Sequence, residues 1–439
     1  MSAIEGALRP RLGERLLVPG DDEYKIGSRV WNAAVDKRPA AIARCRDAAE
    51  VAGVVRAARE AGLPISVRAG GHDWAGRALC DGGVVVDLTG MRAVEIEGDA
   101  ATVQGGATAR DVLQVAASQG LAAVTGVERG VGMVGFTTGG GYGPLVGRCG
   151  LGADNLLSAE VVLADGTIVQ ADEDLLWALR GGGGNFGVVT SMRLRLHPIP
   201  MVLAGMLVFP IHEAADVLKG YAELVAAAPD ELTVMTGFAQ QSVFLCPVWC
   251  GDDLAAGEPY VARLRSLGHP FVDQVGPVPY EVAAGMFEAN AVPGNHYLLR
   301  SAWTRELTGG TARALTAGAV AASSPFDVLF VNRFHGAAAR VDPAATAFAH
   351  RAPHQVIEVI AVWQPDQPED EHRAWADGVV GAVEALPGAY PNQLGPEEDE
   401  RARDSFGDNL DRLLRVKRRY DPGNVFTAIP SLTTKARTP

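Results

Sequence analysis

The sequence GVERGVGMVGFTTGGGYG, residues 126–143, has glycine at eight of its eighteen positions and is the most informative segment for the fold. Two more glycine turns flank it, RAGGHD at 68–73 and GGGGNFG at 181–187. Glycine adopts positive φ and lets backbone N–H groups approach a ligand closely. Successive N–H groups in such turns form concave anion sites suited to a pyrophosphate. One turn alone would be an ordinary connection between strands, but three before residue 190 indicate a large phosphate-bearing cofactor.

Two of these segments also match the dinucleotide pattern G-x-G-x-x-G, at residues 130–135 and 182–187. That pattern is informative only when a strand precedes it and a helix follows it. The second match has the reverse order, with the predicted helix EDLLWALR (173–180) before it and the predicted strand VVTSMRLRL (188–196) after it. The first match also lacks the required context. We therefore do not expect a Rossmann nicotinamide site.

The surrounding sequence predicts an α+β fold. Residues 45–62 have helical periodicity and end at Gly62, and residues 156–171 are typical of a β-hairpin that turns at Asp165-Gly166. From residue 201 to about 385 the glycine clusters stop. Predicted strands at 201–209 and 355–363 alternate there with predicted helices at 213–228 and 371–386. This change from glycine-rich turns to alternating strands and helices indicates a second domain.

Composition and charge narrow the function. The chain has 439 residues and a net charge of −13, without a basic run, which argues against nucleic acid or an anionic membrane as a partner. The N-terminal stretch lacks the apolar segment of a signal peptide, so we expect a cytoplasmic protein. We expect a monomer or a homodimer. The five cysteines form no disulfide framework, and Cys246 and Cys250 lie in an apolar run that predicts buried thiols, with no metal.

Several motifs together resemble one family. Arg68–Asp73, VVVDL and Val103–Ala107 resemble the PCMH-type FAD-binding domain of the vanillyl-alcohol-oxidase superfamily. The segments TGGGYG (138–143), CGLGADN (149–155), WALRGGGGNFG (177–187), TAFAHR (346–351), YPN (390–392) and KRRYDPGNVF (417–426) narrow the resemblance to berberine-bridge-enzyme-like FAD-linked oxidases. The match is collinear over nearly the whole chain.

The resemblance implies a two-part FAD-binding domain over residues 1–200. It also implies an α+β substrate domain over 201–385, with an antiparallel sheet covered by helices, and a C-terminal segment over 386–439 that returns to the FAD domain. The expected FAD-binding residues are Arg68, Ala69, Gly70, Gly71, His72, Asp73, Gly126, Thr138, Gly139, Gly140, Gly141, Tyr142, Asn185, Gly187 and Val189. We expect the pyrophosphate to rest on the N–H groups of Ala69–Gly71 and Gly139–Gly141.

In this family the histidine of the R-x-G-G-H motif, here His72, bonds to the 8α-methyl of the flavin. Many relatives add a cysteinyl bond just before the GGGYG loop, but this chain has Val127-Glu128-Arg129 there, and Cys149 lies after the loop. We therefore expect one histidyl bond and no second link, as in members of the 6-hydroxy-D-nicotine oxidase type. After Asn424 many relatives carry a polar segment. This chain continues Val425-Phe426-Thr427-Ala428-Ile429-Pro430, so that wall of the site is more apolar or the loop runs differently.

The resemblance implies hydride transfer from a small organic substrate to flavin N5, with O₂ as acceptor and H₂O₂ as product. Natural products, amines and phenols or hydroquinones are the candidate substrate classes. Tyr390 and Asn392 form the family's Y-x-N pair, and Glu358 is a second candidate base if burial raises its pKa, although an exposed Glu358 fits the strand pattern equally well. Trp303, Asn332, His335 and Trp363 are candidate pocket residues. Two alternatives stay open, a flavin-bearing protein that sequesters a ligand and a dehydrogenase with another acceptor.

Overall fold

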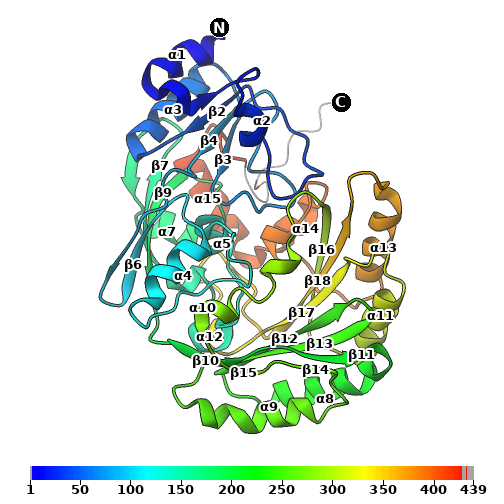
Figure 1. The fold of residues 1–439 in the computed structure, drawn as a ribbon. Helices are drawn as coiled ribbons and strands as arrows, with labels where there is room; N and C mark the ends of the chain where they lie inside the picture. Colours follow the sequence, from blue (N-terminus) through cyan, green and yellow to red (C-terminus); the bar gives the residue numbers. More distant parts are fainter. Residues whose placement is uncertain (1, 428–431, 433–439) are drawn as a thin grey trace.

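The computed structural model describes residues 2–427 and residue 432. Two smaller sheets form its upper half in Figure 1, and one large sheet forms the lower half. The expected α+β class is confirmed, as are the two-part first half and the helix-covered antiparallel sheet of the second. Ala428, Ile429 and Pro430, on which part of the expectation about the late loop falls, lie outside the described residues.

The first sheet has four strands in the order β1-β2-β4-β3, and its last three strands are parallel. The strands are β1 (Leu16–Leu17), β2 (Ala41–Arg44), β3 (Ile65–Arg68) and β4 (Val84–Asp87). Helix α3 (Ala48–Glu60) covers it and begins where the Asp47 carboxylate accepts the N–H of Glu50 at 2.8 Å. The helix ends before Gly62, which has φ +65°. Strand β3 leads directly into the turn that carries His72.

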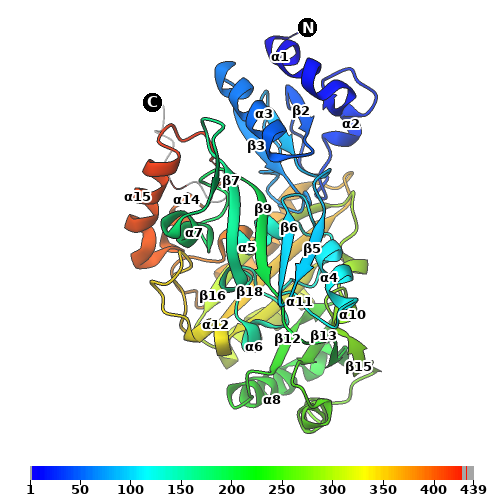
Figure 2. The same ribbon diagram turned by 90° about the vertical axis from the view of Figure 1, so that its left-hand side faces the viewer.

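The second sheet has five strands in the order β5-β6-β9-β7-β8, of which β5, β6, β9 and β7 lie side by side in Figure 2. The strands are β5 (Val94–Glu97), β6 (Ala100–Gln104), β7 (Leu156–Val162), β8 (Ile168–Gln170) and β9 (Val188–Arg195). Strands β7 and β8 form the predicted hairpin. Helix α7 (Glu173–Leu179) precedes the 181–187 turn and β9 follows it, which confirms the order that argues against a Rossmann site.

The third sheet has nine strands, of which seven follow the order β14-β11-β13-β12-β17-β18-β16. Its strands are β10 (Met201–Ala204), β11 (Leu207–Pro210), β12 (Leu232–Ala239), β13 (Ser242–Trp249), β14 (Val272–Asp273), β15 (Gly276–Pro279), β16 (His296–Thr304), β17 (Val328–Phe334) and β18 (His354–Trp363). The prediction of a single strand over 201–209 is wrong. Gly205 divides it, with φ +153° and no space for a Cβ, which would lie 2.2 Å from the Gln274 carbonyl oxygen.

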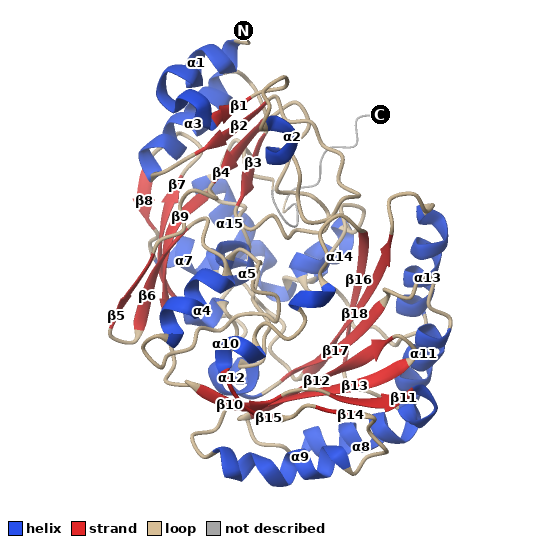
Figure 3. Ribbon diagram, viewed as in Figure 1, coloured by secondary structure: helices blue, strands red, loops and turns tan. Residues whose placement is uncertain are grey.

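Four helices cover one face of this sheet, as Figure 3 shows: α8 (Ala214–Ala226), α9 (Glu258–Arg265), α11 (Gly309–Val320) and α13 (Glu369–Gly381). Because side chains alternate along a strand, every second residue points into this helix-covered core. Val234, Leu245, Leu329, Val331 and Val359 are buried there. The other face of the sheet is turned toward the two smaller sheets, and it forms one wall of the candidate site.

The remaining helices join the layers. They are α1 (Ala3–Leu12), α2 (Tyr24–Gly27), α4 (Ala109–Ala117), α5 (Met133–Thr138), α6 (Val146–Cys149), α10 (Tyr280–Ala283), α12 (Gly336–Arg340), α14 (Asp399–Asp404) and α15 (Leu410–Tyr420). Helix α15 packs against α7 of the first half, and Arg412 pairs with Asp174 at 3.1 Å. In the described part of the chain, no helix has the length and apolarity needed to cross a membrane.

Candidate active site

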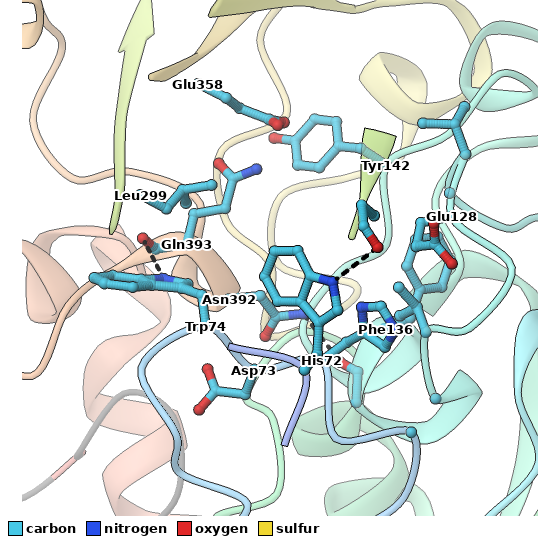
Figure 4. A pocket seen from close by; sticks show the side chains of 18 of the residues that line it. His72, Asp73, Trp74, Glu128, Phe136, Tyr142, Leu299, Glu358, Asn392 and Gln393 are labelled. Carbon is cyan, nitrogen blue, oxygen red and sulfur yellow. Dashed lines mark hydrogen bonds between the residues drawn. The ribbon is translucent and has the colours of Figure 1, made fainter. Parts of the chain in front are cut away.

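A cavity of about 1130 Å³ lies between the glycine turns of the first half and the free face of the nine-stranded sheet. Small-molecule pockets usually have volumes of about 300–1,000 Å³. The cavity is therefore large enough for a cofactor together with a substrate. Figure 4 shows residues of both halves converging on it, with His72 and Glu128 from the first half and Glu358 and Gln393 from the second.

His72 follows β3 and lines the cavity. Burial lowers the pKa of its imidazole to about 4, so the ring is neutral at pH 7. Trp31 stacks on the ring with centroids 5.4 Å apart. Gly130 packs against its edge, where a Cβ would lie only 2.7 Å from Nε2. The ring is therefore held in place, and its unprotonated nitrogen is available as a nucleophile.

The turn before His72 offers a row of backbone donors. Ala69, Gly70 and Gly71 line the cavity, and none of their N–H groups donates a hydrogen bond to another described residue. Gly71 has φ +68°, and a Cβ on Gly70 would lie 2.5 Å from the Gly132 nitrogen. Three unengaged N–H groups in a tight turn suit an anion such as a pyrophosphate. This turn fits the phosphates of FAD, as the sequence predicts.

The second predicted phosphate contact, Gly139–Gly141, needs a correction. The N–H of Gly139 donates to the Gly135 carbonyl and that of Gly140 to the Thr137 carbonyl, both at 3.3 Å. The N–H of Gly141 donates to the Tyr390 hydroxyl at 2.8 Å. These donors are already used within the protein, and the three glycines do not line the cavity. Their role is to bring the 390–392 segment close, since a Cβ on Gly139 would lie 2.1 Å from Asn392 Oδ1.

Asn185 also lies behind the cavity wall. It is buried, and its side-chain amide donates to the Gly182 carbonyl at 2.9 Å. Its own carbonyl accepts the Lys417 ammonium at 2.7 Å, and that ammonium also binds Asp421 Oδ2 and the Phe426 carbonyl, each at 2.6 Å. Helix α15 therefore fixes the shape of the 181–187 turn from behind, and Asn185 supports the turn from within.

Of the predicted cofactor residues, some line the cavity and others support the turns from behind. The predicted residues that line the cavity are Ala69, Gly70, Gly71, His72, Asp73, Gly126, Thr138, Tyr142, Gly187 and Val189. Arg68 does not line it, and its guanidinium instead donates to the Gly27 carbonyl. Sequence motifs identify both the residues that face a ligand and those that shape the loop, because both sets are needed for the same turn.

Glu358 on β18 faces the cavity from the opposite wall. It is half-buried and accepts a 3.0 Å hydrogen bond from the side-chain amide of Asn332 on β17. The Gln393 carbonyl oxygen accepts the Ser301 hydroxyl at 2.7 Å, which turns the amide nitrogen of Gln393 toward Glu358. Burial raises the pKa of Glu358, and the two amide donors oppose that shift. The reading of Glu358 as a solvent-exposed residue is wrong, because the strand face that it occupies borders the cavity.

Tyr390 and Asn392 meet the GGGYG loop. The Tyr390 hydroxyl lies at the cavity and accepts two hydrogen bonds, from the Gly141 N–H and, at 3.2 Å, from the Asn392 amide. Burial raises the pKa of Tyr390 further above its ordinary value. The phenol therefore keeps its proton at neutral pH and can donate it to a ligand. The same Asn392 amide also donates to the Gly135 carbonyl at 3.0 Å.

Three of the four predicted pocket residues lie elsewhere. Asn332 lines the cavity, whereas Trp303, His335 and Trp363 do not. Trp303 is fully buried in a cluster behind Tyr142, His335 contacts Thr233 Oγ1 at 3.4 Å, and Trp363 stacks on His372 under the helix layer. The predictions for Trp303 and Trp363 are wrong because alternate residues of a strand point to opposite faces of the sheet. The sequence alone does not show which face borders the ligand.

Several site residues escaped the sequence analysis. Gln393 lines the cavity with Glu358 and directly follows the Y-x-N pair, so its position next to that motif could have pointed to it. The Nδ1–H of His354 donates to the Ala352 carbonyl at 2.8 Å, which leaves Nε2 to accept the Tyr142 hydroxyl at 3.0 Å. Burial lowers the pKa of His354 to about 4, which keeps this acceptor neutral. Trp31, which stacks on His72, carries no motif that could have pointed to it.

Comparison with known proteins agrees with this site. The family model described as FAD binding domain matches residues 39–172, and the one described as berberine and berberine like matches residues 389–432. An FAD-linked oxidoreductase, aurO, of Gibberella zeae is 32% identical over 420 residues, which cover 92% of this chain and 82% of the relative.

The names of two further relatives state their activities. The crystal structure of 6-hydroxy-D-nicotine oxidase from Arthrobacter nicotinovorans superposes with a TM-score of 0.85 at 29% identity, covering 94% of this chain and 96% of the other. The xylooligosaccharide oxidase of Thermothelomyces thermophilus is 28% identical over 92% of this chain and 89% of its own. With the glycine turns, the cavity and both domain matches in agreement, the chain is an FAD-binding oxidoreductase of the berberine-bridge-enzyme-like family.

Proposed function

We propose that this enzyme is an oxidase that holds FAD through a single covalent bond to His72 and uses Glu358 to take a proton from an organic substrate. The observation that carries the proposal is that a neutral imidazole and a carboxylate, both half-buried, face one cavity from opposite walls. A substrate between them would contact the flavin on one side and a base on the other.

The tether follows from the surroundings of His72. A covalent bond to the 8α-methyl of FAD needs an unprotonated ring nitrogen, and burial supplies one by lowering the pKa to about 4. Trp31 and Gly130 restrict how the ring can turn. The free N–H row of Ala69–Gly71 lies next to it in the chain and suits the phosphates of the same cofactor.

A second link is not expected in this proposal. Val127 and Glu128 line the cavity where relatives place a cysteine, and Glu128 accepts the Gly130 N–H at 2.8 Å. Cys149 does not line the cavity, and burial raises the pKa of its thiol to about 12. A protonated thiol away from the cavity is a poor nucleophile toward the flavin.

When bound, FAD would supply the redox chemistry: it would take a hydride from the substrate and pass both electrons to O₂, giving H₂O₂. The protein handles the proton. The Glu358 carboxylate accepts it from the substrate hydroxyl or amine. The hydride leaves the carbon that bears that group, or, in a 4-alkylphenol, the benzylic carbon conjugated with the hydroxyl, or, in a hydroquinone, the second hydroxyl. In each case the substrate loses two electrons and two protons in total. Asn332 holds the carboxylate in place. Tyr390, with both lone pairs occupied, acts as a hydrogen-bond donor to the substrate and not as the base.

Two experiments test the proposal. Reduced holoenzyme is mixed with O₂, and H₂O₂ is measured. Rapid reoxidation with one H₂O₂ per flavin supports an oxidase, whereas slow reoxidation indicates a dehydrogenase with another acceptor. Separately, 4-methylphenol, methylhydroquinone and benzylamine are added without oxygen. Bleaching of the flavin absorbance by any of them supports turnover, whereas tight binding with a persistently oxidised spectrum favours the sequestering protein.

A further inference from the structure

The wall of the cavity beyond Glu358 is organised as a single cross-strand row. The residues paired across successive strands are Ser301 on β16, Glu358 on β18, Phe330 on β17, Gly237 on β12, Phe244 on β13, Val208 on β11 and Val272 on β14. Of these, Glu358, Phe330, Phe244, Val208 and Val272 line the cavity. The row is polar at one end only.

The length of this row is set by sheet geometry. Five strand spacings separate Glu358 from Val272, and at about 4.8 Å per spacing the row extends over about 24 Å. The outer end opens at Phe271, which precedes Val272, lines the cavity and is 62% exposed. A small ring beside Glu358 would leave most of this wall uncovered.

The neighbouring rows have the same character. Met206, Met235, Cys246, Val328 and Ile360 also face the cavity. The rings of Phe330 and Phe244 lie edge to face with centroids 5.6 Å apart, and Phe287 closes on Phe330 at 5.1 Å. Hydrogen-bonding side chains gather near Glu358, where Asn332 binds it and Gln393 also lines the cavity, and at the rim, where Gln240 and Ser242 lie.

Both faces of these strands are apolar. On the opposite face, helices cover the apolar side chains. The cavity face is apolar although a cavity, and not a helix layer, borders it, and the cavity is continuous with the His72 pocket. Apolar surface of this extent favours a ligand that removes it from water, at about 25 cal/mol per Å². A sugar chain would place hydroxyl groups against phenylalanine and valine without partners, which is costly.

We infer that the substrate is an elongated, largely apolar molecule, with its oxidised polar group at Glu358 and an aromatic or alkyl body that extends along the Phe330–Phe244–Val208 row. This inference rests on the proposed function for the placement of the oxidised end. The body of the ligand is recognised by the row itself, whether or not the ligand is turned over.

The test measures binding and not turnover, so its failure is distinct from failure of the proposed oxidase. The probes are 4-n-alkylphenols from methyl to octyl, with xylobiose as the polar probe. They are titrated by calorimetry into anaerobic holoenzyme whose flavin has been reduced beforehand, so that no probe is oxidised. Each added methylene should tighten binding by about fourfold, the equivalent of 0.8 kcal/mol. Xylobiose should bind more weakly than 4-octylphenol by at least a hundredfold.

Val208→Asn should reduce the affinity for 4-octylphenol at least tenfold and leave that for 4-methylphenol within twofold. Val320→Asn, an equally conservative change at an exposed position away from the cavity, should affect neither. Glu358→Gln should weaken all members by a similar factor without changing the dependence on chain length. Affinity that does not depend on chain length, or equal losses for short and long phenols in Val208→Asn, would overturn the inference.

Discussion

Asn332 donates a 3.0 Å hydrogen bond from its side-chain amide to the Glu358 carboxylate on the adjacent strand. The two side chains stand on the same face of the nine-stranded sheet, where Phe330 is directly paired with Glu358 and Asn332 lies two residues further along β17. The bond points the carboxylate into the cavity and leaves its second oxygen for Gln393 or a substrate. A carboxylate oriented in this way is positioned to accept a proton from a substrate in the cavity.

Glu358→Gln should lower kcat by about 10²–10⁴-fold, because an amide cannot accept the proton. FAD content should stay unchanged, since the glycine turns proposed to bind the cofactor lie on the opposite wall. Steady-state kinetics with an oxidisable substrate and the flavin absorbance measure the two effects. Asn332→Ala is the matched control and should cost less, since it removes a positioning bond only. A Glu358→Gln enzyme with wild-type kcat would rule out Glu358 as the base.

The pH profile of kcat/KM should carry the signature of Glu358. Burial raises the pKa of this carboxyl, and a base works only when ionised. Activity should therefore rise with pH along an acidic limb centred above the ordinary range of a glutamate. Initial rates from pH 4 to 9 measure the limb. It should be absent from the residual activity of Glu358→Gln, and an unchanged limb in that variant would assign the titration to another group.

The tether has a direct chemical readout. Wild-type protein should stay yellow after acid precipitation, and so should Cys149→Ala, whereas His72→Ala should release its flavin into the supernatant. Because Glu128 lines the cavity beside Gly130, Glu128→Cys should place a thiol where relatives carry their second link. In the double variant His72→Ala/Glu128→Cys, some flavin should then remain bound. Loss of flavin from the wild type on precipitation would show that no covalent bond exists.

Arg351 and Asp154 form an ion pair that joins the two halves behind the site. The guanidinium is buried and binds both carboxylate oxygens at 2.8 and 2.9 Å. Arg351→Leu leaves Asp154 without this partner and should cost about 3–5 kcal/mol of unfolding free energy. Urea unfolding measures the loss. Arg340→Ala, which breaks the more exposed pair with Asp230, should cost about 1 kcal/mol or less, and equal losses in both variants would contradict this account.

Acid should destabilise the protein through two buried histidines. Burial lowers the pKa of both His335 and His354 to about 4 in the folded state, from 6.5 for a free side chain. Between these values the unfolded chain binds more protons than the folded one, so stability falls as the pH decreases from about 6.5 to 4, by up to about 3 kcal/mol per histidine. Thermal unfolding across this range measures the fall. His354→Gln should reduce the pH dependence, and an unchanged slope would exclude His354 as a contributor.

The sequence predicted the glycine turns of the site well, because the backbone conformation of such a turn depends on residues next to one another in the chain. The turn at Ala69–Gly71 needs glycine for its φ values and close contacts, so the motif and the structure coincide. Local pattern also misled at Gly139–Gly141, where glycines of the same appearance serve to admit Asn392 and Tyr390. A glycine motif indicates that other atoms pack closely against the backbone. It does not indicate whether those atoms belong to a ligand or to another segment of the protein.

Residues close together in the chain are enough to predict the glycine turns, the histidine that lines the cavity and the α+β class. Only the tertiary structure decided which face of the large sheet borders the cavity. It thereby placed Glu358 and Asn332 at the site and moved Trp303, His335 and Trp363 away from it. The reason is that strand alternation defines two faces but does not name them, and strands far apart in sequence must pair before one face is covered by helices and the other left to a ligand.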